Sequence, residues 1–238
     1  MKTIGLIGGM SWESTAPYYR EINLAVREQL GGLHSAKIIL YSVDFHEIAQ
    51  LQRANQWAQA GARLAEVAQT LERAGADALV LCTNTMHTVA ASIEAAVRIP
   101  LLHIADPTAA AIARAGYQTV GLLGTRFTME QDFYRARLEQ RHGLRVLTPP
   151  QSDRELVHRV IFDELCAGKI EPASRQAFLR VISDLAEQGA QAIILGCTEI
   201  ALLLEQQQGD IPLFDTTRLH AQSAAHWALA PPQSPGEA

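Results

Sequence analysis

A cysteine and a threonine stand at matching positions in two segments of the chain, and both are candidates for moving protons. Cys197 follows the apolar run of "QAIILGCTEI" (191–200), where a strand is expected to give way to a helix. A helix start favours the thiolate through its dipole and its free N–H groups, so Cys197 is the stronger candidate for a general base. The segment "AGADALVLCTNT" (74–85) aligns with "QGAQAIILGCTE" (188–199), and Thr83 then falls opposite Cys197.

Two such strand ends form a site only if the fold brings them to one cleft. In open α/β sheets, ligands bind beyond the carboxyl ends of the strands. If two sheets face each other, Thr83 and Cys197 approach one small molecule from opposite sides. That placement suits removal of a proton from one face of a carbon atom and delivery of a proton to the other face.

Short apolar segments alternate with helical segments along most of the 238 residues. The apolar segments are rich in Ile, Leu and Val and are mostly continuous, as in strands buried on both faces of a parallel sheet. This alternation predicts an α/β fold. "TIGLIGG" (3–9) also aligns with "TVGLLGT" (119–125), so the halves predict a duplicated unit. The predicted strands cover residues 3–8, 37–45, 77–82, 101–106, 119–124, 144–149, 191–197 and 211–216, and the clearest helices cover 61–76 and 174–190.

The glycine-rich turn in "GLIGGMSWEST" (5–15) offers backbone N–H groups to an anion such as a carboxylate. It fits neither G-x-G-x-x-G nor the G-K-[ST] ending of a P-loop, so a dinucleotide or nucleoside triphosphate site is not indicated. The hydroxyls of Ser11, Ser14 and Thr15 either donate to a ligand or cap the helix that follows.

Polar side chains also follow the strand that ends near Thr83, in "CTNTMH" (82–87). Asn84 and Thr85 are able to bind a carboxylate or to cap a helix. His87 falls about one turn into that helix, which favours a structural role over a direct one.

The other two cysteines and one acidic residue complete the set of candidates. Cys82 precedes the position that matches Cys197 by one residue, so in a strand it points to the opposite face and into the core. Cys166, in "IFDELCAGK" (161–169), is predicted to be a core residue of a helix. Glu199 is either an acid at a helix start or a residue that orients a substrate ammonium group.

The composition excludes several classes of function. A net charge of −5 leaves no basic footprint for nucleic acid, and no run of about 18 apolar residues predicts a membrane span. The first residues lack the pattern of a signal peptide, so a cytoplasmic location is expected. Three cysteines without a C-x-x-C pair predict neither a disulfide framework nor a zinc site.

Four motifs in the same order resemble the aspartate/glutamate racemase family of cofactor-independent racemases: "GLIGGMSWEST", "CTNT", "GLLGTRFT" and "GCTE". "VDFHEI" and "LCTNTMH" are further similar to an enterobacterial subgroup. The resemblance spans about residues 1–220. It implies two similar Rossmann-like parallel-sheet domains, related by pseudo-twofold symmetry, with the active site in the cleft between them. The expected division is a first domain of 1–100 plus 210–230, a second domain of 101–209 and a flexible, Pro- and Ser-rich tail of 231–238.

The resemblance also implies a homodimer, no pyridoxal phosphate, no metal, and two cysteines on opposite faces of the α-carbon of the substrate. This chain departs from the pattern, because Thr83 replaces the first cysteine while Cys197 is the second. Racemisation of aspartate or glutamate is the leading hypothesis, with homoserine-like or broader amino acids as further candidates. Thr83 and Cys197 are the implied catalytic pair. The implied substrate-binding residues are Met10, Gln52, Asn84, Thr85, Thr125, Lys169, Thr198 and Glu199.

Gln52 and Lys169 bear on the choice of substrate. By resemblance, Gln52 stands where members that act on acidic substrates commonly carry an arginine, and a neutral amide also accepts a neutral polar side chain. Lys169 supplies a positive charge near the cleft by its family position, or is a solvated lysine at a helix end. The single cysteine leaves three alternatives open: a one-cysteine decarboxylase, a dicarboxylate isomerase of the same superfamily, or a non-catalytic amino-acid-binding protein.

Overall fold

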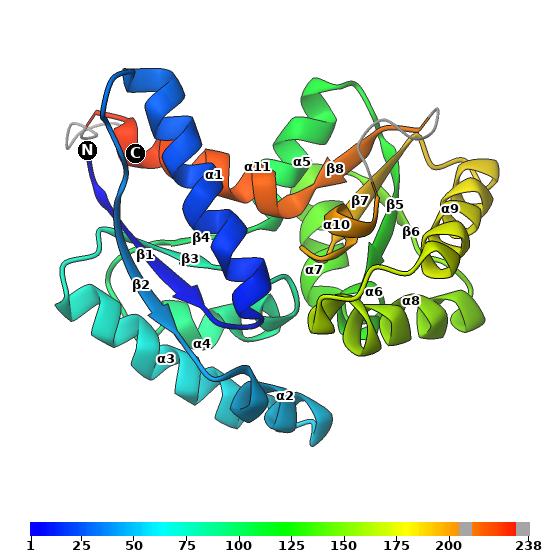
Figure 1. Ribbon diagram of the computed structural model, residues 1–238, viewed down its shortest axis with the longest axis horizontal. Helices are drawn as coiled ribbons and strands as arrows, with labels where there is room; N and C mark the ends of the chain where they lie inside the picture. The colour runs from blue at the N-terminus through cyan, green and yellow to red at the C-terminus, as the bar shows by residue number, and fades with distance from the viewer. Residues whose placement is uncertain (205–210, 232–238) are drawn as a thin grey trace.

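The computed structural model describes residues 1–204 and 211–231, and its strands form two four-stranded parallel sheets (Figure 1). The first sheet has the strand order β2-β1-β3-β4, and the second has the order β6-β5-β7-β8. The two orders are equivalent, because each sheet places its second strand on one side of its first and the other two strands on the other side. The predicted α/β class and the duplicated unit are confirmed.

The elements alternate along the chain as the sequence predicts, and every predicted strand overlaps an observed one. In the first half they are β1 Thr3–Gly8, α1 Trp12–Leu30, β2 Lys37–Ser42, α2 Phe45–Arg53, α3 Trp57–Arg73, β3 Ala78–Leu81, η1 Thr85–Val89, α4 Ala90–Glu94, β4 Leu101–Leu102 and α5 Ala105–Arg114. In the second half they are β5 Thr119–Gly124, α6 Arg126–Glu130, α7 Asp132–Ala136, η2 Arg137–Arg141, β6 Arg145–Leu147, α8 Gln151–Asp163, η3 Leu165–Ala167, α9 Pro172–Glu187, β7 Ala192–Gly196, α10 Ile200–Leu203, β8 Leu213–Asp215 and α11 Thr216–Leu229.

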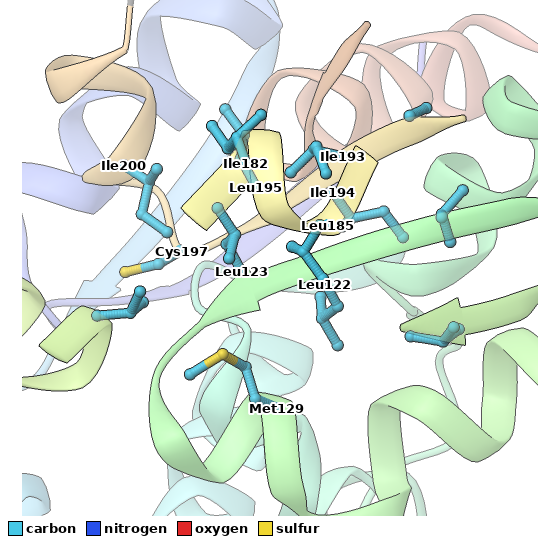
Figure 2. Packing of buried hydrophobic residues seen from close by; sticks show 14 of the residues in the cluster. Leu122, Leu123, Met129, Ile182, Leu185, Ile193, Ile194, Leu195, Cys197 and Ile200 are labelled. Carbon is cyan, nitrogen blue, oxygen red and sulfur yellow. The ribbon is translucent and has the colours of Figure 1, made fainter. Parts of the chain in front are cut away.

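Apolar side chains fill both faces of each sheet, which explains why the strands are continuously hydrophobic. Successive residues of β1 point to opposite faces, so Leu6 packs with α1 and α11 while Ile7 packs with α3. The core of the second sheet reaches the end of β7, where Figure 2 shows Cys197 beside Leu123 and Ile200. The pair of sheets therefore forms a rigid support for the residues at the strand ends.

The two outermost strands differ from the expected division of the chain. β4 pairs with β3 in the first sheet, although 101–209 was expected to form the second domain. β8 pairs with β7 in the second sheet, although 210–230 was expected to return to the first domain. The chain returns to the first sheet only with α11, which packs on α1 and β1 through buried alanines. The carbonyl oxygen of Ala228 in this helix accepts a hydrogen bond from the backbone N–H of Lys2 (2.9 Å). Residues 232–238 of the expected tail lie outside the described residues.

Two glycines allow the ends of β5 and β7 to lie close together. A Cβ atom on Gly124 would stand 2.8 Å from the carbonyl oxygen of Gly196, and one on Gly196 would stand 2.9 Å from the carbonyl oxygen of Leu123. Both distances are shorter than contacts between real Cβ atoms and oxygen, so larger residues would force these strands apart. The glycines thus hold the following residues, Thr125 and Cys197, at one edge of the sheet.

Candidate active site

One cavity lies where the strand ends of the two sheets meet. It is small and partly open to solvent. Residues just beyond the carboxyl ends of β1, β3, β5 and β7 line it, and this is the edge at which open α/β sheets bind ligands. The lining residues are Met10, Ser14, Phe45, Gln52, Thr83, Asn84, Thr85, Thr125, Ile161, Phe162, Cys166, Gly196, Cys197, Thr198 and Glu199.

This cavity brings together every site residue predicted from the sequence except Lys169. Thr83 reaches it from the end of β3 and Cys197 from the end of β7, so the two come from different sheets. Lys169 is exposed and does not line the cavity. The chain turns at Gly168 (φ 71°), and the backbone N–H of Lys169 donates to the Glu164 carbonyl at 2.9 Å, so this residue ends a helical turn instead.

A buried carboxylate accepts the proton of the Cys197 thiol. Cys197 Sγ lies 3.0 Å from Glu199 Oε2, and the two residues are only 8% and 3% exposed. The other oxygen, Glu199 Oε1, accepts hydrogen bonds from Ser14 Oγ at 2.5 Å and Ser11 Oγ at 3.1 Å. These serines stand at the start of α1 in the first half of the chain. The carboxylate is thus held by donors from both halves and directed at the thiol.

The expectation of a thiolate favoured by a helix start is not met. Burial raises the pKa of the Cys197 thiol well above its usual range, and the negative charge of Glu199 raises it further. The helix that follows, α10, has four residues and begins only at Ile200, so its dipole offers little compensation. Cys197 therefore rests as a neutral thiol that donates to Glu199, and forming the thiolate requires transfer of its proton.

Cys166 is a third member of this group, and its prediction as a helix core residue is only partly right, because it is half-buried against the core. It belongs to η3, the short turn between α8 and α9, and its side chain lines the cavity. Its Sγ lies 3.5 Å from Glu199 Oε1, so one carboxylate faces two thiols. Burial and the charge of Glu199 raise the pKa of the Cys166 thiol. No motif surrounds Cys166; the only signal is the following glycine, Gly168, which ends the helical pattern two residues later.

Hydroxyl groups cover the cavity wall between the two sheets. Thr85 Oγ1 lies 2.9 Å from Thr125 Oγ1, which joins the end of β3 to the end of β5. Thr125 also accepts a hydrogen bond from Thr128 N at 3.3 Å as the N-cap of α6. Thr198 Oγ1 accepts from Thr217 Oγ1 at 3.0 Å. The hydroxyl of Thr125, predicted only as a substrate-binding group, thus caps α6 while lining the cavity.

The orientation of the Asn84 amide follows from its neighbours. Thr216 Oγ1 donates to the Leu195 carbonyl at 2.8 Å, so it accepts the hydrogen bond that Asn84 Nδ2 donates at 3.1 Å. Asn84 Oδ1 is buried and has no partner among the described residues. A buried acceptor without a donor is costly, so this oxygen is suited to a donor carried by a ligand.

The comparison with known proteins decides the family. A model of the Asp/Glu/hydantoin racemase family matches residues 7–224. The chain belongs to this family. In the described ranges, no group of three or more His, Cys, Asp or Glu side chains is placed to hold a metal ion, and no helix is long and apolar enough to cross a membrane.

Individual relatives of this racemase agree with the assignment. A Yersinia pestis protein assigned to the Asp/Glu racemases has a crystal structure with a TM-score of 0.90 and 60% identity, covering 97% of this chain and 100% of that one. An aspartate racemase homologue from Pyrococcus horikoshii has a TM-score of 0.83 and 34% identity, covering 96% and 99%. The broad specificity amino-acid racemase RacX of Bacillus subtilis is 24% identical over 237 residues, or 95% of this chain and 98% of that protein. The protein is thus an enzyme of the isomerase class.

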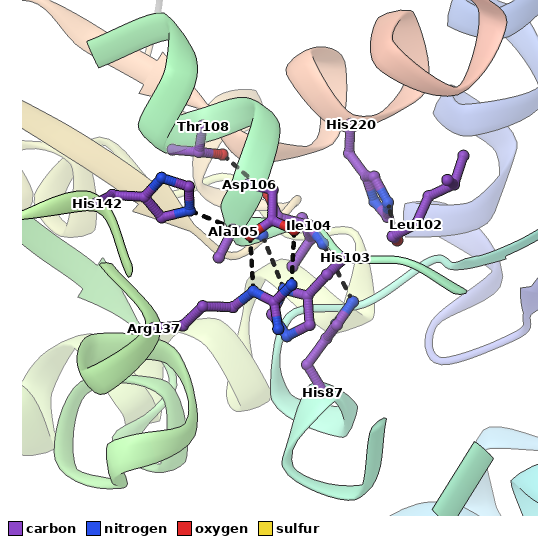
Figure 3. A network of polar contacts seen from close by, with 10 residues as sticks. All are labelled: His87, Leu102, His103, Ile104, Ala105, Asp106, Thr108, Arg137, His142 and His220. Atoms are coloured by element: carbon purple, nitrogen blue, oxygen red, sulfur yellow. Dashed lines mark hydrogen bonds and ion pairs between the residues drawn. The ribbon is translucent and has the colours of Figure 1, made fainter. Parts of the chain in front are cut away.

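His87 of the racemase supports the backbone beside Thr83. The backbone N–H of Ile104 donates to His87 Nε2 at 3.3 Å, so the ring proton resides on Nδ1, which donates to the Thr83 carbonyl at 2.8 Å. Figure 3 shows His87 together with His103 and His220 in one buried group. His87 does not line the cavity, which agrees with the structural role predicted for it.

These three histidines are buried in their neutral form. Burial lowers the pKa of His220 to about 4 and that of His103 to about 3, and in His103 the charge of Arg137 contributes next. The pKa of His87 is also lowered well below its usual range by burial and then by His103. Each hydrogen bond that His220 makes, with Tyr18 Oη (2.9 Å) and the Leu102 carbonyl (2.7 Å), is satisfied by a neutral ring.

The racemase is expected to lose stability in mild acid because of these rings. A lowered pKa in the folded state means that the unfolded chain binds more protons below about pH 6.5, so this contribution is present above that pH and is lost as the pH falls toward 4. The expected loss is about 1.5 kcal/mol per buried histidine between pH 6.5 and 5. Urea unfolding at these pH values measures it. His220→Gln should reduce the pH dependence, whereas the exposed His34→Gln should not; equal slopes in both variants would contradict the assignment.

Proposed function

We propose that this racemase interconverts the L- and D-enantiomers of acidic amino acids, aspartate and glutamate first, with Thr83 and Cys197 on opposite faces of the α-carbon. The main support is that these two side chains line one cavity from equivalent strands of the two sheets, β3 and β7. A carbanion formed between two proton-transferring groups is planar and accepts a proton from either side. Either enantiomer then leaves the site.

The cavity offers partners for both charged groups that an amino acid carries on its α-carbon. The hydroxyls of Thr85, Thr125 and Thr198 are donors for the α-carboxylate. Donors placed there stabilise the negative charge that develops on the carboxylate when the α-proton leaves. Asn84 Oδ1, the buried acceptor without a partner, suits the α-ammonium group. These contacts orient the α C–H bond between Thr83 and Cys197.

On the Cys197 face, Glu199 takes part in the proton transfer. The thiol proton passes to Glu199 Oε2, 3.0 Å away, and the resulting thiolate removes the α-proton. The electron pair of the C–H bond moves toward the carboxylate, which becomes enediolate-like. Return of both protons restores the thiol and the amino acid.

On the opposite face of the α-carbon, Thr83 is a weaker proton donor than a thiol would be. A hydroxyl is far less acidic than a thiol, whose free pKa is about 8.5. Thr83 therefore acts by relaying a proton from water or from the substrate rather than by ionising. Proton exchange is expected to be faster at the Cys197 face. The equilibrium between enantiomers stays at unity, because they have equal free energies in water.

Deuterium exchange tests the proposal without assuming a substrate. The purified racemase is incubated in D2O with L-aspartate, L-glutamate and a panel of neutral L-amino acids, without added cofactor. Deuterium at the α-position together with D-product, followed by NMR and chiral chromatography, is the expected result. Loss of a carboxyl group as CO2 would favour the one-cysteine decarboxylase instead. No exchange with any amino acid would overturn the proposal.

A thiol at position 83 should accelerate the reaction. Thr83→Cys restores a second ionisable group, and we expect kcat/KM to rise about tenfold, since a positioned acid or base contributes about 10²–10⁴-fold in general. Circular dichroism of the substrate measures the rate in both directions. Thr70→Cys, on α3 and outside the cavity, is the matched control. A slower Thr83→Cys enzyme would mean that the hydroxyl has a role that a thiol cannot replace.

Two predictions from the sequence accompany this proposal, a homodimer and a cytoplasmic location. The dimer has some support in an apolar face of α1, on which Trp12 is 67% exposed and Tyr19 is 57% exposed. These residues are seven apart and lie on one side of the helix, where a second copy would cover them. Sedimentation of the wild type and of Trp12→Ser would test it.

A further inference from the structure

A second cavity adjoins the first and carries an excess of positive charge. It is formed between the end of α2, from the first half of the chain, and the helices α6 and α8 of the second half. We call it the vestibule. Its lining residues are Gln52, Arg53, Asn55, Arg126, Phe127, His158, Arg159, Phe162 and Asp163.

The vestibule adjoins the proposed reaction site. Gln52 and Phe162 line both cavities, so the two spaces share a wall. Aromatic contacts fix the position of Phe127 in the lining of the vestibule. Its ring packs edge-on against Trp57 of α3, with ring centroids 5.1 Å apart, and against His158, with centroids 5.9 Å apart. A substrate side chain that extends from the α-carbon past Gln52 would point toward the vestibule.

The three arginines of the vestibule are not committed to carboxylates of the protein. Within residues 1–204 and 211–231, Arg53, Arg126 and Arg159 form no ion pair, whereas seven other arginines do. The one acidic residue of the lining is Asp163. Burial and then the charge of Arg126 lower the pKa of the neighbouring His158, against the opposing charges of Asp163 and Glu130. Guanidinium groups bind carboxylates in a planar, two-point geometry.

We propose that Arg126 and Arg159, with Arg53 across the opening, form a subsite for the distal carboxylate of substrates that carry it on an extended side chain. This inference rests on the proposed function and narrows it. Glutamate and its longer homologue 2-aminoadipate would use the subsite more fully than aspartate. Lys169, the cation predicted for this role, lines neither cavity.

Calorimetric dissociation constants test the subsite directly. L-Aspartate, L-glutamate, L-2-aminoadipate and the neutral isostere L-glutamine are titrated into the wild type and into the double variant Arg126→Gln/Arg159→Gln. Both arginines are exposed, so each contact is modest, and we expect the double variant to bind 2-aminoadipate and glutamate about threefold to tenfold more weakly relative to glutamine. The loss for aspartate should be smaller. Arg114→Gln, an exposed arginine of α5 outside both cavities, is the matched control.

Salt dependence gives a second measurement that needs no variant. Charges at an exposed subsite are screened over about 10 Å at 0.1 M salt, so the wild type should bind glutamate more weakly as salt rises, and glutamine should change less. The subsite is overturned if the double variant weakens glutamate and glutamine equally, or if the wild type binds none of the acids. The two proposals fail separately: absence of deuterium exchange sinks the racemase mechanism, while the binding constants still decide the subsite.

Discussion

Cys197→Ser is expected to reduce α-proton exchange by about 10²–10⁴-fold, the usual contribution of a positioned general base. The serine hydroxyl retains the size of the thiol and is able to donate to Glu199, but it does not form an anion at accessible pH. The thiol is buried and 3.0 Å from Glu199 Oε2, closer to that carboxylate than the 3.5 Å of Cys166 Sγ. Deuterium incorporation into glutamate and aspartate, followed by NMR, measures the loss.

A loss of rate in this variant has to be separated from a loss of folding. Cys82→Ala is the matched control, because Cys82 is also a buried cysteine that directly follows a strand, β3, but its side chain lies in the core of the first sheet. That variant should retain its exchange rate, and both should show cooperative thermal unfolding. Exchange at the wild-type rate in a folded Cys197→Ser enzyme would place the base elsewhere, with Cys166 as the next thiol in reach of Glu199.

The features of the fold and the site that depend on local sequence pattern could be predicted from the sequence alone. Continuous apolar runs such as 119–124 and 191–197 mark strands buried on both faces, and the repeat of glycine and strand reveals the duplicated unit. Because parallel strands end at one edge, Thr83, Thr125 and Cys197 were expected together, and they line one cavity. These predictions required only periodicity and the direction of the strands.

Features that depend on contacts between distant segments could not be predicted in the same way. The partners of Glu199 include Ser11 and Ser14, 188 and 185 residues away, and no periodicity records that contact. The high pKa of the Cys197 thiol follows from burial and from this carboxylate, whereas the sequence indicated only a helix start. The exchange of β4 and β8 between the expected domains has the same origin, since strand pairing is a long-range choice.

Glu199→Gln should lower the pKa of the Cys197 thiol and nevertheless slow catalysis. Removing the negative charge lowers the pKa of the thiol, because that charge raises it in the wild type. Removing the proton acceptor should nevertheless slow α-proton exchange about 10²-fold. Alkylation by iodoacetamide across the alkaline range reports the pKa of the thiol, in a Cys166→Ser background so that Cys197 is the accessible thiol. The same background serves for the exchange rates.

A lower thiol pKa combined with a slower reaction distinguishes two roles for Glu199. If the carboxylate only holds the thiol in place, a lower pKa yields more thiolate at neutral pH and a faster enzyme. If the carboxylate receives the thiol proton, the Gln variant forms its thiolate more readily on titration. It nevertheless lacks an acceptor for the thiol proton during the reaction, so its rate falls. Glu13→Gln in the same background is the matched control, because this carboxylate lies near enough to act on position 166 through its charge but makes no described hydrogen bond to Cys197. A faster Glu199→Gln enzyme would reduce Glu199 to a positioning residue, and proton transfer from the thiol would then have to proceed to solvent.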